Sequence, residues 1–174
     1  GILAAVYKAA DTYTQKDVAV KALKFNTAFN TQEDLIRFKR QLVKVIAFPH
    51  PNIVSVFEKG EYQGTNFLVM ELVEGASLLE LFRQNKRFSI PEAVELIFQA
   101  LKGLEYAHSN GLIHRDIRPS NIIIDKNTNE ARILDFGLAE FIEYTQITRP
   151  EDVSSVFCYI SPEQSGIMKR SGDI

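Results

Sequence analysis

The first third of the chain alternates apolar and polar residues with the two-residue period of β-strands. This alternation predicts four strands, at residues 6–10, 17–23, 53–57 and 66–71. A polar turn at 11–16 separates the first strand from the second, and one at 60–64 separates the third from the fourth. Between the second and third strands, Thr31 and Asp34 have the spacing of a capping box, and apolar residues then recur at helical spacing up to Pro49. The region therefore predicts a small sheet with one helix.

From Gly75 onward the apolar residues follow a helical period. A short helix is predicted at residues 77–85, and a longer one begins at Ser89, which forms a second capping signal with Glu92. The longer helix has a C-cap signal at Asn110. Its apolar stripe comprises Ala93, Ile97, Ala100, Leu101, Leu104 and Ala107.

The last third combines short strands with irregular structure. Residues 122–124 and 131–134 predict two strands around a turn, and residues 138–160 predict a long loop of the kind that usually carries function. A strand-rich first part and a helix-rich second part together predict an α+β fold with two lobes. The cleft between them is expected near residues 71–75.

Composition narrows the possible partners. The 20 Lys and Arg against 22 Asp and Glu give a net charge of −2, so no nucleic-acid partner is expected. No apolar run reaches the roughly 20 residues that span a bilayer, so no membrane segment is expected in this sequence. The single Cys158 cannot form an internal disulfide, which fits a reducing compartment and a cytoplasmic location.

Residues 114–121 carry the strongest chemical signal. Asp116 and Asn121 lie five residues apart in a predicted loop after a helix. A carboxylate can accept the proton of an attacking hydroxyl, and an amide oxygen can bind a hard cation such as Mg²⁺. The plainer interpretation is a polar connection between a helix and a strand, but the length of the motif argues against it.

Three further segments are weak when each is taken alone. Asp135 precedes Phe136-Gly137 directly after a strand, where a carboxylate can hold Mg²⁺ against phosphates, although most such triplets are simple turns. Lys21 ends an apolar strand and could reach phosphate, although strand-end lysines are usually solvated. Glu163 follows Pro162, where an acid commonly begins a helix.

In this order the four segments resemble the signature set of the protein kinase family. Residues 50–54 also match the family pattern, and the resemblance covers essentially the whole chain. It implies a two-lobed protein kinase-like fold, cut at both ends. An N-lobe at residues 1–71 would hold a five-stranded antiparallel sheet and one helix, and residues 72–174 would form an incomplete, mainly helical C-lobe.

The resemblance also implies the cofactors ATP and Mg²⁺ and a role for each matching residue. Lys21 would contact the α- and β-phosphates, Asp116 would act as the catalytic base, and Arg118 would keep a positive charge near the transferred phosphate. Asn121 and Asp135 would hold the metal. The nucleotide-binding residues would further include Gly1 of a glycine-rich loop and the gatekeeper Met70. Glu71 and Val73 would offer backbone groups to the adenine edge, and Val6, Ala19 and Ile123 would sandwich the adenine ring. A hydrophobic column would link Val45, Val56, His114 and Phe136.

The resemblance extends to substrate class and control. Pro119 and Ser120 match the Ser/Thr class, so the expected partner is a protein hydroxyl. Residues 161–164 resemble bacterial members, some of which carry further signalling domains. Arg115 implies control by phosphorylation of the long loop, since a phosphate would neutralise its guanidinium. The candidate sites are Thr145, Thr148, Ser154 and Ser155.

Several positions depart from the family pattern. Ala4 replaces a glycine of the phosphate loop, Gln41 replaces the helix glutamate that pairs with the strand lysine, and Val156 replaces a threonine. These changes keep open a second interpretation, a pseudokinase that binds nucleotide or a partner without efficient transfer. A third, an unrelated small-molecule phosphotransferase, fits less well because of the long loop and residues 161–163. The isolated sequence is expected to be marginally stable or inactive.

Overall fold

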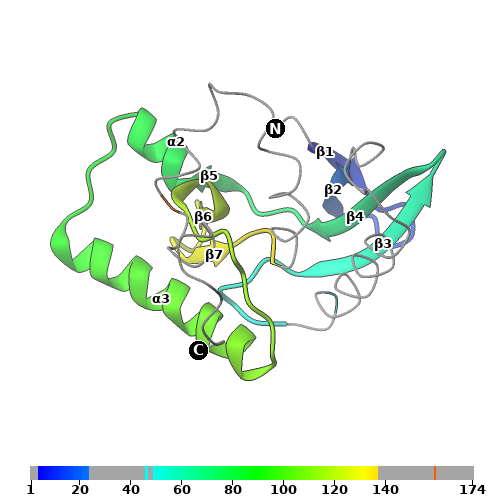
Figure 1. Cartoon of the computed structure of the whole chain (residues 1–174). Coiled ribbons are helices and arrows are strands. Elements are labelled where there is room, and N and C mark those ends of the chain that lie inside the picture. Colours follow the sequence, from blue (N-terminus) through cyan, green and yellow to red (C-terminus); the bar gives the residue numbers. More distant parts are fainter. Residues whose placement is uncertain (1–3, 24–45, 47–48, 137–158, 160–174) are drawn as a thin grey trace, which may run out of the picture.

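The computed structural model describes residues 4–23, 46, 49–136 and 159 (Figure 1). One sheet is antiparallel, has the order β1-β2-β4-β3, and comprises β1 (Ala4–Ala10), β2 (Asp17–Leu23), β3 (Val56–Tyr62) and β4 (Thr65–Glu71). A second, smaller sheet has the order β5-β6-β7 and comprises β5 (Gly75–Ser77), β6 (Ile122–Asp125) and β7 (Ala131–Ile133). The helical elements are α2 (Leu78–Arg83), α3 (Ile90–Ser109) and the 3₁₀ turn η1 (Pro119–Asn121).

The first sheet differs from the expectation in strand number and in one boundary. The described residues place four strands in it rather than five. The third strand begins at Val56 instead of at residue 53, because Ile53 forms a parallel bridge to Ile133 of the other sheet. Gly60 also belongs to β3 and not to the turn, which lies at Gln63 and Gly64 with positive φ angles.

Both predicted helix starts in the second part are confirmed. Ser77 and Ser89 each accept a hydrogen bond from the backbone N–H of the glutamate three residues later, and each glutamate accepts one in return. Glu80 and Glu92 complete these capping boxes, and their hydrogen bonds to the two serines lower the pKa of each carboxyl. The capping box at Ser89 was expected from the sequence, whereas at Ser77 only the helix was predicted and its capping box is a finding of the structure.

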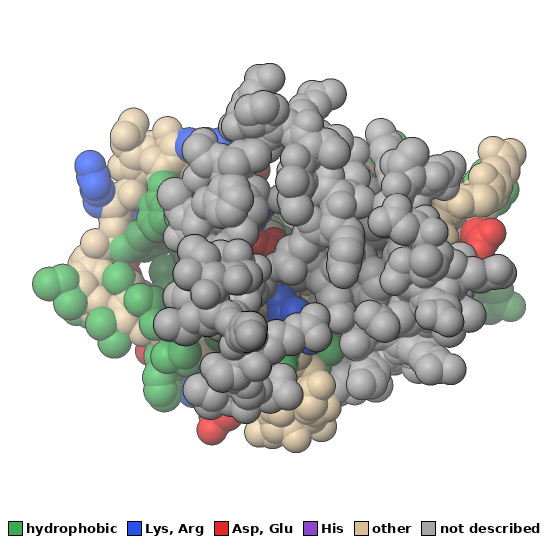
Figure 2. Space-filling view, viewed as in Figure 1, with side chains coloured by type: hydrophobic (Ala, Val, Ile, Leu, Met, Phe, Trp, Pro, Cys, Tyr) green, Lys and Arg blue, Asp and Glu red, His purple; other side chains and the backbone are tan. Residues whose placement is uncertain are grey.

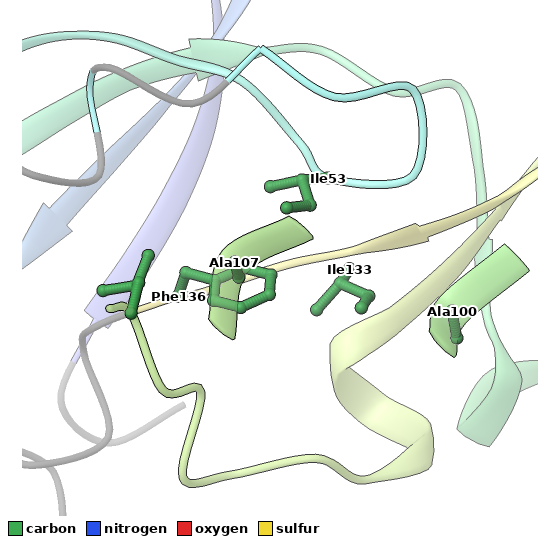
Figure 3. Close-up of a cluster of buried hydrophobic side chains, with 6 residues drawn as sticks. Ile53, Ala100, Ala107, Ile133 and Phe136 are labelled. Carbon is green, nitrogen blue, oxygen red and sulfur yellow. The ribbon is translucent and has the colours of Figure 1, made fainter. Parts of the chain in front are cut away.

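The core between α3 and β7 is built from small residues on the helix. Ala100, Gly103 and Ala107 are the buried residues of α3, and a Cβ on Gly103 would lie 3.1 Å from the carbonyl oxygen of Asn52. Figure 3 shows two of them, Ala100 and Ala107, in one cluster with Ile53, Ile133 and Phe136. Small side chains allow the helix to approach the sheet closely.

The predicted apolar stripe of α3 is therefore only partly buried. Ala100 and Ala107 face the core, but Ile97 and Leu101 are 61% and 55% exposed. Figure 2 shows hydrophobic side chains gathered on this side of the molecule. The close approach of the small residues puts the larger ones on the neighbouring face of the helix. None of the helices in the described residues combines the length and apolarity needed to cross a bilayer.

Candidate nucleotide and phosphoryl-transfer site

The segment between α3 and β6 is organised around His114. This side chain is 1% exposed, its Nε2 lies 2.7 Å from the carbonyl oxygen of Leu134, and its Nδ1 accepts a 3.2 Å hydrogen bond from the backbone N–H of Asp116. The ring also makes an edge contact with Phe136, with centroids 4.6 Å apart. Burial lowers the pKa of His114, so the neutral ring with its proton on Nε2 fits both hydrogen bonds.

Asp116 and Asn121 are held together by two hydrogen bonds. Nδ2 of Asn121 donates to the backbone oxygen of Asp116 at 2.8 Å and to its Oδ2 at 2.7 Å. The 3₁₀ turn η1 ends at Asn121, whose side chain is buried. These bonds assign the amide nitrogen, and among the described residues they leave Oδ1 with a single 3.4 Å contact, from the Ser120 hydroxyl. That oxygen can therefore serve as a ligand for a hard cation.

Arg118 lies beside the Asp116 carboxylate. Its Nε donates to Oγ of Ser120 at 2.9 Å and lies 3.6 Å from Oδ1 of Asp116. Both side chains of this ion pair are about a quarter exposed. The arrangement places one guanidinium and one carboxylate side by side, both partly exposed to solvent. Sequence reasoning assigned no role to Ser120 beyond its class signal, because a serine hydroxyl between two polar residues has no distinctive pattern.

Lys21 and Asp135 meet from opposite ends of the described chain. Lys21 lies in β2 with its side chain almost buried, and its Nζ is 2.5 Å from Oδ1 of Asp135. Asp135 follows β7 and has a φ of 66°, a strained left-handed conformation for a non-glycine residue. The backbone N–H of the preceding Leu134 donates to the carbonyl of Asn121 at 2.9 Å. One connected network therefore links Lys21, Asp135, Asn121 and Asp116.

Most of the predicted adenine-contacting side chains belong to one apolar cluster. Ala19 and Met70 are buried in it, and Val73 and Ile123 pack against it. Val6 is the register partner of Lys21 on the neighbouring strand β1 and is largely exposed. The sheet and the start of the second lobe thus share this cluster. Gly1 lies outside the described residues.

The backbone N–H of Glu71 is already bonded within the described residues. It donates to the carbonyl oxygen of Ser55 at 2.9 Å, so the backbone group that Glu71 could offer an adenine edge is its carbonyl. Its side chain binds Arg132. This ion pair was not foreseen, because the two residues are far apart in the sequence.

A large hollow of about 1120 Å³ lies on the other face of the first sheet. Its lining includes Val18, Val20 and Val69, which alternate along β2 and β4 with Ala19, Lys21 and Met70. Successive side chains of a strand point to opposite faces. The hollow is therefore distinct from the connected network around Lys21, and its size alone does not make it the site of the chemistry.

The comparison with known families agrees with this geometry. A family model described as "Protein kinase domain" matches residues 1–171. The chain belongs to the protein kinase family.

Curated members of the kinase family include several bacterial relatives. The chain is 38% identical to "Serine/threonine-protein kinase PrkC" of Bacillus subtilis, over 100% of this chain and 27% of that protein. It is 34% identical to "Probable serine/threonine-protein kinase PknB" of Lactococcus lactis and 35% identical to "Serine/threonine-protein kinase PknB" of Mycobacterium leprae, in each case over 95% of this chain and 26% or 27% of the relative. The chain thus spans about a quarter of the length of these relatives.

A kinase metal site does not need a dedicated cage of side chains. The described residues contain no group of three His, Cys, Asp or Glu that could hold an ion. Mg²⁺ is commonly bound by one or two protein oxygens together with substrate phosphates and water. The carboxylate of Asp135 and Oδ1 of Asn121 fit that requirement.

Several predicted kinase features fall outside the described residues. Among them are the Gln41 substitution, Val45 of the hydrophobic column, Gly137, the four candidate phosphorylation sites, Val156 and Glu163. The other three members of the column lie together, since Phe136 contacts the ring of His114 and shares a cluster with Val56.

Proposed function

We propose that this chain is the catalytic domain of an ATP-dependent protein serine/threonine kinase. It would transfer the γ-phosphoryl group of Mg-ATP to a hydroxyl of a protein substrate. The observation that carries the proposal is a pair of side-chain contacts, Lys21 with Asp135 and Asn121 with Asp116, joined by the backbone hydrogen bond from Leu134 to Asn121. The names of the bacterial relatives support the Ser/Thr class.

Each member of the network has a proposed task. Asp116 accepts the proton of the substrate hydroxyl, and Arg118 stabilises negative charge beside it. Asn121 and Asp135 hold Mg²⁺, which when bound neutralises charge on the phosphates. Lys21 orients the α- and β-phosphates with its ammonium. Little covalent chemistry falls to the protein, so positioning and electrostatics account for most of the catalysis.

The nucleotide base would lie against the apolar cluster between the lobes. Ala19, Met70, Val73 and Ile123 supply the apolar walls, the carbonyl of Glu71 accepts a hydrogen bond, and Val6 and Gly1 cover the nucleotide. In this proposal residues 1–71 form the N-lobe and residues 72–174 form part of the C-lobe. A cytoplasmic location, a signalling role and further domains in the full-length protein belong to the same proposal.

The test uses the full-length protein. Mg-ATP should raise its melting temperature, because a ligand at about 100 times its Kd stabilises the folded state by about 2.7 kcal/mol. Phosphate from γ-labelled ATP should appear on the protein or on a generic basic protein. Asp116→Asn should lower transfer by about 10²- to 10⁴-fold and leave nucleotide binding intact.

Asp125→Asn is the matched control. Asp125 is a partly exposed carboxylate at the end of β6, where it accepts a hydrogen bond from the backbone N–H of Asn127. An asparagine can keep this bond, so transfer should be unchanged. Binding of Mg-ATP without transfer, even in a Gln41→Glu variant, would instead favour the pseudokinase interpretation. Absence of both binding and transfer would contradict the proposed function.

A further inference from the structure

The ion pair between Glu71 and Arg132 connects the two sheets behind the proposed adenine site. Glu71 is the last residue of β4, and it follows Met70 directly. Its two carboxylate oxygens accept hydrogen bonds from the two terminal nitrogens of Arg132, at 2.5 and 2.7 Å. The backbone N–H of Ser55 adds a weaker contact at 3.4 Å. The pair is therefore bidentate and joins residues 61 positions apart.

Arg132 is committed to this contact. It lies in the middle of β7, and its side chain is 14% exposed. Nη2 also reaches the carbonyl oxygen of Ile53 at 3.4 Å, and Nε is buried with no hydrogen-bond partner among the described residues. A guanidinium loses less freedom than an ammonium in forming two parallel bonds, because its fork is rigid. The contact thus fixes direction as well as distance.

A second ion pair at the same connection provides a contrast. Glu74 binds Lys126 at 2.9 Å, but these side chains are 50% and 62% exposed. Exposed pairs of this type contribute little to stability or to geometry. The pair of Arg132 and Glu71 is less exposed, at 14% and 30%, and its partner strand leads within three residues to Asp135.

Stability alone explains this partly buried pair poorly. Replacing both members of a buried ion pair by uncharged residues is often neutral or stabilising, and part of the same desolvation cost applies here, where the Arg132 side chain is 14% exposed. What a bidentate pair adds is a defined geometry between the groups that carry it. Here these groups are the backbone of Glu71, whose carbonyl is the proposed acceptor for the adenine edge, and strand β7, which ends two residues before Asp135.

We propose that Glu71 and Arg132 are a pair of positioning residues that holds the adenine-binding backbone at a fixed distance from the metal-binding Asp135. The inference rests on the proposed kinase function and deepens it. Neither side chain touches the reacting atoms. Their contribution is to bring the base-binding and metal-binding parts of the site into register before the nucleotide arrives, which lowers the cost of binding it.

The experiment measures KM for ATP, kcat and melting temperature in the full-length protein. Glu71→Gln and Arg132→Met should each raise KM for ATP about five- to tenfold, with kcat changed less than about twofold. The double variant should show no further rise in KM, because either change alone already breaks the contact. Lys126→Met breaks the exposed pair and is the matched control, with an unchanged KM.

The double variant also separates positioning from a purely structural role. It leaves no unpaired buried charge, so its melting temperature should recover relative to the single variants while its KM stays high. If KM follows the melting temperature back to the original value, or never changes, the positioning role is overturned. Arg132→Lys keeps the positive charge but can make only one contact with Glu71, so it should give an intermediate KM for ATP. This variant still tests the positioning role if Glu71→Gln or Arg132→Met does not fold.

Failure of the positioning role is distinguishable from failure of the kinase function. An active, Asp116-dependent enzyme whose variants keep a normal KM would overturn only the positioning role. An unmodified protein that neither binds Mg-ATP nor transfers phosphate would overturn both.

Discussion

The loop of residues 114–121 takes its shape from bonds among its own members, whereas Lys21 and Asp135 meet only because two sheets pack together. In the loop, His114 fixes the backbone of Asp116, and the side chain of Asn121 fixes its carboxylate. Outside the loop, His114 depends on the carbonyl of Leu134. Lys21, by contrast, contributes nothing to Asp135 until β2 and β7 are both in place.

This difference predicts how the two regions respond to substitution. A change at Asp116, Ser120 or Asn121 should affect chemistry more than folding, because these residues support one another locally, whereas His114 of the same loop is also buried in the core. A change at Lys21 or Asp135 should affect both chemistry and folding, since the two charges are also part of the packing between the lobes. The variants below test this separation in the full-length protein.

The largest effect is expected for Asp135→Asn. Asparagine keeps the size of the side chain but removes the charge proposed to hold Mg²⁺, and a bound metal is worth several kcal/mol in charge stabilisation, or about a thousandfold in rate. Initial rates of transfer measured against Mg²⁺ concentration check this. Asp17→Asn, which affects only an exposed pair with Lys8, should leave the rate unchanged. A variant within tenfold of the original rate would remove Asp135 from the metal site.

Lys21→Met should lower both stability and nucleotide affinity. It leaves the carboxylate of Asp135, which is 20% exposed, without its partner, and the expected loss is about 1–3 kcal/mol in the free energy of unfolding. Denaturant unfolding without nucleotide measures this loss, and Lys8→Met is the exposed control, with little or no change in stability. The double variant Lys21→Met/Asp135→Asn should recover stability. Additive losses would show that the two residues do not interact.

Acid should weaken the structure around His114. Burial lowers its pKa, so the unfolded chain binds a proton more readily than the folded one. The stabilisation is complete above the ordinary histidine value of about 6.5 and is lost as the pH falls through the lowered pKa of the folded state. Unfolding free energies measured from pH 8 to pH 5 should decline.

A histidine variant identifies the source of this decline. His114→Asn should be less stable at every pH but should show a shallower decline, whereas His108→Asn, at an exposed position near the end of α3, should keep the original slope. Part of the slope will remain, since burial also lowers the pKa of His50. An unchanged slope in His114→Asn would refute the assignment.

The sequence predicted the features that local signals encode. The strand at Asp17–Leu23, the capping box of Ser89 and Glu92, and the turn between β6 and β7 follow from spacing within a few residues. The association of Asp116 with Asn121 was likewise expected from one short motif, although their catalytic roles stay predictions.

Features that depend on packing between distant segments were missed. Residue 53 was expected in a strand of the first sheet, but Ile53 pairs with Ile133 because the loop at 49–55 packs against β7. In α3 burial was predicted from hydrophobicity, whereas the structure buries the smallest side chains, because the helix can approach β7 closely only where its side chains are small. The ion pair of Glu71 with Arg132 has no periodic signal at all.

The smallest effect is expected at Ser120, and it tests how self-contained the loop is. Ser120→Ala removes the hydroxyl that accepts the hydrogen bond of Arg118 Nε, so the guanidinium should lose its fixed position beside Asp116. The loss of one hydrogen bond, about 1 kcal/mol, corresponds to a fall in kcat of about fivefold, with KM for ATP and melting temperature unchanged. Ser120→Thr keeps the hydroxyl and should retain most of the rate. If stability fell along with kcat, the loop would depend on the rest of the fold as Lys21 and Asp135 do, and the contrast between the two regions would not hold.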